Sequence, residues 1–174
     1  MKFFFFFILL FISTNVFAKN YAFVNLNYLI ENNIEYKNFL TEINHKESKY
    51  KKQLLEKEKN IEKLKNEIDS GSLILSEIEL KNMIIEYNFQ LEDFNKKLKQ
   101  INLEIEENII NARKLMLSKI RNILVEISQT NDYDFILDEN NILIVDNELD
   151  ITKEVSLLLN ETSIQLQEIL KSEN

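Results

Sequence analysis

Apolar residues recur at alternating intervals of four and three along two long stretches of the chain. In the first stretch these positions are Tyr36, Leu40, Ile43, Glu47, Tyr50, Leu54, Lys57, Ile61, Leu64 and Ile68, and all but Glu47 and Lys57 are apolar. In the second they are Leu80, Ile84, Tyr87, Leu91, Phe94, Leu98, Ile101 and Ile105. An apolar seam that repeats every 3.5 residues on average predicts a helix that packs along another helix.

One turn-like segment, Asp69-Ser70-Gly71-Ser72, separates the two stretches. Gly71 is the only glycine of the chain, which also has no proline, so no other residue is expected to interrupt the helices. Each helix therefore finds its partner in the other. We predict a mostly helical chain with a long antiparallel coiled-coil hairpin over residues 31–128. Its tip is expected near residues 69–72, and its length is roughly 50 Å at about 1.5 Å per residue.

The charges of the two predicted helices are complementary. Residues 46–65 contain eight lysines and four glutamates, whereas residues 77–96 contain five acidic residues and two lysines. Folding about Gly71 would bring these segments opposite each other and would place Leu55 near position 87. Attraction between the segments favours this register, although an exposed ion pair contributes only about 0.2–1 kcal/mol. A solvated lysine-rich face is an equally good interpretation of the same pattern.

Beyond Ile105 the apolar spacing no longer follows a strict heptad. The apolar positions there are Ile109, Ala112, Met116, Ile120, Ile123 and Ile127. A break in the heptad predicts that the coil straightens or unwinds. This is where the hairpin is expected to enter a globular base.

Three short apolar runs near the two ends of the chain predict the strands of that base. They cover residues 21–24, 133–137 and 142–145, and the last two are joined by a turn-like segment over residues 138–141. Asp150 stands where a helix N-cap belongs, before a last helix that is expected to reach about Leu170.

The predicted base is discontinuous and small. It consists of residues 19–30 and 129–174, which are too few for a sizeable independent core. Apolar strands in so small a unit need further cover, and oligomerisation would provide it. The residues expected at that oligomer interface are Phe23, Val24, Phe135, Ile136, Leu137 and Ile144.

The first 18 residues have the features of an export signal. Lys2 precedes an unbroken apolar run over residues 3–12, and Val16 and Ala18 occupy the −3 and −1 positions of a cleavage site. A permanent transmembrane helix needs about 20 apolar residues, which disfavours the alternative of an uncleaved membrane anchor. We predict cleavage before Lys19 and no membrane span in the mature chain.

Composition argues against several classes of function. Residues 31–128 carry 17 basic and 18 acidic residues, and residues 129–174 carry 2 basic and 11 acidic residues. Neither region has the basic face expected of a nucleic-acid-binding protein. His45, the single histidine, falls at an outward position of the hairpin, and one glycine cannot form a glycine-rich phosphate loop. We expect no catalytic residues, metal site or cofactor.

Several apolar residues fall outside the predicted seam. They are Leu55, Ile78, Ile85, Phe89 and Leu103. Ile78, Ile85 and Phe89 lie on one strip of the second helix because they are seven and four residues apart. Exposed apolar surface usually marks an interaction site. The strip would contact either an unfolded client protein or a neighbouring arm, or its residues are isolated exposures that the fold tolerates.

The two ends of the chain resemble the Skp/OmpH family of periplasmic chaperones. The segment Tyr21-Ala22-Phe23-Val24-Asn25-Leu26 resembles the opening strand of that family, and Tyr133-Asp134-Phe135-Ile136-Leu137-Asp138 resembles its second strand. The segment Asp150-Ile151-Thr152-Lys153-Glu154-Val155 is similar to the Asp-Ile-Thr-x-x-Val start of the last helix in the family. The predicted export signal and hairpin stand in the same order as in the family.

This resemblance implies a homotrimer held together by a small β-rich trimerisation base. The helical arms would bind unfolded outer-membrane proteins in the periplasm and prevent their aggregation without ATP. The best-known members have basic arms, whereas the arm of this chain is close to neutral, so we transfer no lipopolysaccharide site to it.

Two other functions fit parts of the pattern. A structural coiled-coil adaptor of an envelope export system also contains a helical hairpin, but such adaptors flank it with glycine-bearing lipoyl-like strands and carry a membrane anchor. A coiled-coil scaffold on a membrane surface would need a basic amphipathic face or a lipid anchor.

Overall fold

The computed structural model describes residues 19–71, 74–144 and 146–171. The predicted signal segment 1–18 lies outside the described residues. In chain order the elements are β1 (Tyr21–Val24), α2 (Leu26–Asn32), α3 (Ile34–Gly71), α4 (Glu77–Thr130), β2 (Phe135–Asp138), the 3-10 helices η2 (Glu139–Asn141) and η3 (Asn147–Leu149), α5 (Thr152–Glu161) and α6 (Gln167–Lys171). The prediction of a mostly helical chain with long helices and a small sheet is confirmed.

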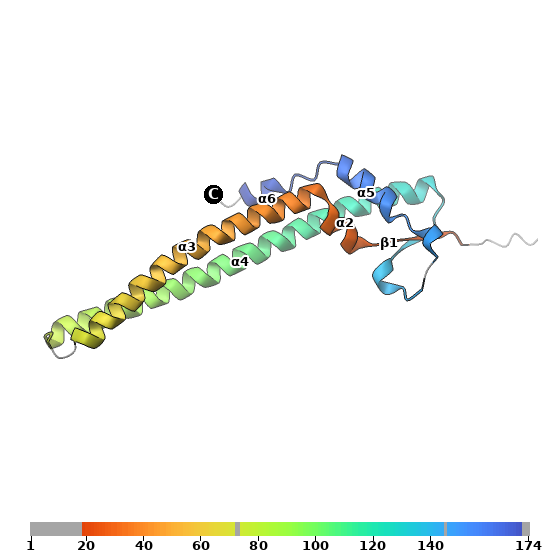
Figure 1. Cartoon of the computed structure of the whole chain (residues 1–174). Coiled ribbons are helices and arrows are strands. Elements are labelled where there is room, and N and C mark those ends of the chain that lie inside the picture. Colours follow the sequence, from red (N-terminus) through yellow and green to blue (C-terminus); the bar gives the residue numbers. More distant parts are fainter. Residues whose placement is uncertain (1–18, 72–73, 145, 172–174) are drawn as a thin grey trace, which may run out of the picture.

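Two long helices form an arm that projects from a small base (Figure 1). Helix α3 has 38 residues and α4 has 54, and the two lie side by side along the arm. Helix α4 begins with a capping box, in which the Ser76 side chain accepts a hydrogen bond from the Glu79 N–H and the Glu79 carboxylate accepts one from the Ser76 N–H. The connection between the helices follows Gly71, because the expected turn residues Asp69 and Ser70 are still helical.

Gly71 has no left-handed backbone conformation, since no glycine with positive φ occurs among the described residues. Its role is steric. A Cβ atom at this position would lie 2.5 Å from Cδ1 of Leu75, the residue that follows the end of α3 by one turn. The glycine therefore leaves room for the Leu75 side chain.

The base contains a two-stranded parallel sheet. Strand β1 pairs with β2 in a register that places Tyr21 opposite Phe135 and Val24 opposite Asp138, and Phe23 forms an isolated bridge with Asp150. Parallel strands need a long crossover connection, and here the whole hairpin provides it.

The expected third strand over residues 142–145 is wrong for the described part of that range, since residues 142–144 form no strand. Aspartate side chains explain the difference. Asp138 accepts a hydrogen bond from the Asn140 N–H, and Asp146 accepts one from the Glu148 N–H. Such local side-chain bonds compete with pairing to a sheet, and they fold the chain into η2 and η3.

The last helix also differs from its prediction. An Asp150 oxygen accepts a hydrogen bond from the Thr152 N–H at 2.8 Å, but the N-cap position belongs to Ile151. Helix α5 ends at Glu161 instead of continuing to Leu170. Gln165 then adopts a left-handed φ of 62°, which no helix continues through, and the chain enters α6.

The hydrophobic core lies where the arm meets the base. Buried side chains from β1, α2 and α5 pack against the roots of both long helices. Those from the long helices are Tyr36, Phe39, Ile43, Ala112, Met116, Ile120, Ile123 and Ile127. The α4 residues among them belong to the region where the heptad was predicted to loosen. The core therefore extends beyond residues 19–30 and 129–174 into the first turns of α3 and the last third of α4.

Candidate functional surface on the arm

The seam of the arm is shallow along most of its length. Ile61 is the only buried residue among the described residues between positions 44 and 100. Most other seam residues, such as Leu54, Leu91 and Phe94, are half-buried. Ile84 and Leu98 remain 41% and 37% exposed. Two helices alone cannot enclose their contact, so the arm keeps much of its apolar surface accessible.

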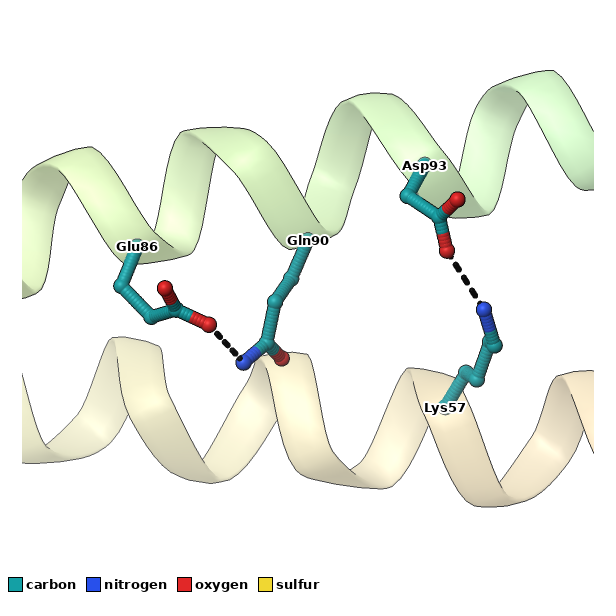
Figure 2. Close-up of polar contacts among 4 residues, drawn as sticks. All are labelled: Lys57, Glu86, Gln90 and Asp93. Atoms are coloured by element: carbon teal, nitrogen blue, oxygen red, sulfur yellow. Dashed lines mark hydrogen bonds and ion pairs between the residues drawn. The ribbon is translucent and has the colours of Figure 1, made fainter.

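Polar bonds between the helices show which of their residues lie opposite each other. The Lys57 ammonium donates to a carboxylate oxygen of Asp93 at 2.5 Å (Figure 2). Closer to the base, Lys46 pairs with Glu104, whose carboxylate also accepts a hydrogen bond from the Tyr50 hydroxyl at 2.8 Å. Lysines of α3 therefore do meet acidic residues of α4.

The register predicted from folding about Gly71 is wrong. It placed Leu55 near position 87, whereas Leu55 and its neighbour Leu54 line a surface cleft with Ile101 and Ile105. The shift arises because the connection follows Gly71 and α4 begins only at Glu77.

The interhelical bonds affect the acidity of their carboxyl groups. The hydrogen bond and charge of Lys57 lower the pKa of Asp93. Burial raises the pKa of Glu104, but the bonds from Lys46 and Tyr50 outweigh it and lower that pKa overall. Glu86 and Gln90, which are joined at 2.7 Å along α4, lie beside the same contact (Figure 2). The bonds of Lys57 with Asp93 and of Lys46 and Tyr50 with Glu104 connect the two helices, whereas the bond between Glu86 and Gln90 lies within α4.

All five residues predicted to contact a client are exposed. Ile78, Ile85 and Phe89 on the distal half of α4 are 74%, 58% and 66% exposed, and Leu103 is 47% exposed. Leu55 is exposed on α3 beside Ile101, so it is not level with Phe89 as expected.

Two further exposed residues of α4 were not predicted as client contacts. Ile110 and Leu117 follow Leu103 at intervals of seven and are 42% and 41% exposed. Phe89 precedes Leu103 by fourteen residues, so these four positions share one helical face. We call Ile78, Ile85, Phe89, Leu103, Ile110 and Leu117 the outer α4 stripe. The heptad spacing was the signal that could have identified its lower half.

The outward face of α3 has the opposite character. Its exposed residues at the corresponding heptad positions are His45, Lys52 and Lys59, with Lys49 and Lys63 beside them. The arm therefore presents a row of exposed apolar residues among charged ones on α4 and a mainly cationic surface on α3.

The residues predicted for an oligomer interface divide into two groups. Phe23 and Val24 are each 2% exposed, so the chain already covers them, and Ile136 is half-buried. Phe135 and Leu137 are 40% and 41% exposed.

Ile144 is 92% exposed and lines a cleft with Tyr21, Phe23 and Leu137 beside the open face of the sheet. The Tyr21 ring stacks on Phe135 with its centroid 5.7 Å away. This surface is the apolar part of the base that a single chain leaves uncovered.

The described residues contain no group of three or more His, Cys, Asp or Glu side chains placed to hold a metal ion. His45 is exposed on α3. None of the helices in the described part of the chain combines the length and the apolar character needed to cross a bilayer.

Comparisons with known proteins agree on one family. Residues 20–159 match the family described as "Outer membrane protein (OmpH-like)". A crystal structure from Caulobacter crescentus CB15, of an OmpH-like protein assigned as an outer membrane chaperone, is similar to this structure with a TM-score of 0.73. The alignment covers 82% of this chain and 85% of that chain at 11% sequence identity, so it shows a shared fold. No curated protein sequence matches the chain. The family match spans most of the chain, which therefore belongs to the family of OmpH-like outer membrane proteins.

Proposed function

We propose that the protein is an ATP-independent holdase chaperone of the periplasm that binds unfolded outer-membrane proteins and prevents their aggregation. Membership of the OmpH-like family and the fold shared with an OmpH-like chaperone support a chaperone role. The apolar N-terminal run supports export to the periplasm. The client class follows from the family name and from the chemistry of the arm.

The outer α4 stripe is the observation that carries this proposal. Its six residues extend from the distal end of α4 to its lower half, and each is more than 40% exposed. Lys96 occupies the heptad position between Phe89 and Leu103, so the stripe has a distal apolar part and a lower apolar part. Exposed apolar patches usually mark interaction sites. An unfolded barrel precursor exposes apolar side chains along an extended chain, which can contact the stripe at several points.

Several weak contacts suit a chaperone that releases its client without an energy source. Full burial of a leucine, isoleucine or phenylalanine contributes about 1.5–3 kcal/mol, and a client would cover each stripe residue only partly. Individual contacts can then exchange while the sum retains the client. The outward face of α3 is mainly cationic, with Leu55 as an exposed apolar residue, so we assign client contact chiefly to α4.

Trimerisation completes the proposal. Three copies joined through Phe135, Leu137 and Ile144 would cover the open face of the sheet and hold three arms around one client. Head-to-tail contacts between different surface patches close into rings when the rotation permits, and a threefold ring places equivalent α4 surfaces around a common space.

The test compares two double variants with the parent protein. Ile85→Ser with Phe89→Ser should weaken suppression of the aggregation of a urea-diluted outer-membrane barrel several-fold, because two central contacts are lost. Lys52→Ser with Lys59→Ser alters the outward face of α3 to the same extent and should leave suppression unchanged. Helicity and oligomer mass should match the parent in both. Undiminished protection by the Ile85/Phe89 variant would reject the stripe as the client site.

A further inference from the structure

We infer that residues 160–171 form a strap that locks the root of α3 onto the base and thereby stiffens the arm. The arm joins the base asymmetrically. Helix α4 enters the core without interruption, whereas α3 is separated from α2 by Asn33, which has an extended backbone. The α3 root is therefore the joint at which the arm could loosen.

Two side chains connect that joint to the C-terminal segment. The Asn160 side-chain oxygen accepts hydrogen bonds from the Asn33 side-chain amide and from the Ile34 N–H, both at 3.1 Å. The Glu35 carboxylate accepts one bond from the Ile164 N–H and one from the Gln165 N–H, both at 3.0 Å. One carboxylate in the first turn of α3 thus binds two consecutive amides of the strap.

The strap conformation is built around this contact. Gln165 has a φ of 62°, which is uncommon for residues other than glycine. Left-handed residues help neighbouring N–H groups converge on one anion, here the Glu35 carboxylate. Ile164 and Leu166 on either side of Gln165 are 2% and 0% exposed and belong to the core. The strap is therefore anchored by two buried side chains and by the carboxylate between them.

The strap lies outside the part of the chain that defines the family match. That match ends at residue 159, immediately before Asn160. Helix α6, at the end of the strap, contacts α4, so the segment spans from the α3 root to the other helix of the arm. Because the strap fixes both helices at the base, the arm bends less than an arm that is attached through one helix only. The inference concerns the stiffness of the arm, and only its effect on clients rests on the proposed function.

The experiment uses the full mature chain, which has no cysteine of its own, without a client. Spin labels at Asn38→Cys on α3 and Glu154→Cys on α5 report the distance between the α3 root and the base. Both positions are exposed. Glu35→Gln and Asn160→Ala each break one half of the contact, and Glu31→Ala, an exposed change in the preceding helix, is the matched control.

Release of the strap should broaden the label-to-label distance distribution in Glu35→Gln and in Asn160→Ala but not in Glu31→Ala. In Glu35→Gln the Ile164 and Gln165 amides should exchange roughly ten- to a hundredfold faster, as expected from the loss of hydrogen bonds to a charged group. Helicity by circular dichroism should match the parent. Unchanged amide exchange would overturn the inference, and so would faster exchange with an unchanged distance distribution. Neither result depends on client binding, so a failure of the holdase proposal remains distinguishable.

Discussion

The base and the arm of this protein use similar apolar residues in opposite ways. At the base, Phe39, Met116 and Val155 are completely buried among five elements. Along the distal arm, seam residues are at best half-buried, with Ile61 as the described exception, and the outward apolar residues are open to solvent.

The difference teaches that the arm is not built for its own stability. A helix pair of this length could bury more apolar surface if its seam were wider, and the outer α4 residues add nothing to that burial. Instead the base stabilises the fold, and the arm extends apolar surface into solvent on a scaffold of backbone hydrogen bonds and a few ion pairs. This division suits a protein whose arm contacts other chains.

The largest expected effect is a loss of core packing in the base. Phe39→Ala should destabilise the protein by about 3–5 kcal/mol, as large-to-small changes in cores do. The truncation Leu64→Ala in the half-buried seam of the arm should lower the free energy of unfolding by only about 1 kcal/mol. Urea denaturation at one fixed protein concentration measures both. Equal costs would contradict the distinction between the base and the arm.

A smaller effect is expected where the arm approaches the base. Glu104→Gln removes the charge that binds Lys46 and weakens the bond from Tyr50, and should cost about 0.5–1 kcal/mol because the side chain is a quarter exposed. Glu106→Gln has the same charge change on the exposed surface of α4 and serves as the control. An equal cost for both variants in urea denaturation would show that the ion pair contributes nothing.

Acidification should weaken the arm through the same carboxylates. The pKa values of Asp93 and Glu104 are lowered in the folded state, so their contribution is present above the ordinary value of about 4 and is lost as the pH falls through the folded pKa. Carboxyl NMR titration should find each pKa below the ordinary value of its residue type. Lys57→Gln with Lys46→Gln should return both towards ordinary values, and unchanged values in that variant would contradict the assigned cause.

The smallest effect is expected at the tip. Gly71→Ala gains helix propensity but displaces the flexible end of the Leu75 side chain, so the free energy of unfolding should change by no more than about 0.5 kcal/mol. Adding Leu75→Ala removes the obstacle and should make the alanine at position 71 favourable. The glycine would have a conformational role if Gly71→Ala greatly lowered the free energy of unfolding and the added Leu75→Ala did not restore it.

The parts of the fold that depend on periodicity could be predicted from the sequence. Heptad spacing identified the two long helices, the residues of their contact and the α4 residues that become buried near the base. It also identified outward apolar residues such as Ile85 and Phe89, but not Ile110 and Leu117, which lie beyond Ile105, where the strict heptad ends.

Features that depend on local capping or distant contacts could not be predicted in the same way. The predicted register of the two helices was wrong because the Ser76–Glu79 capping box determines where α4 begins. This four-residue signal was not used in the prediction. Asp138 and Asp146 replaced an expected strand with 3-10 turns. The conformation of the strap depends on hydrogen bonds to Glu35, which is about 130 positions earlier in the chain. A local sequence pattern cannot predict such a distant contact.

Static light scattering of the mature protein, alone and with a urea-unfolded outer-membrane barrel, tests the holdase account most directly. We predict a particle with the mass of three subunits that gains the mass of one client and stays in solution. A stable single-subunit particle that leaves the client to aggregate would contradict the account.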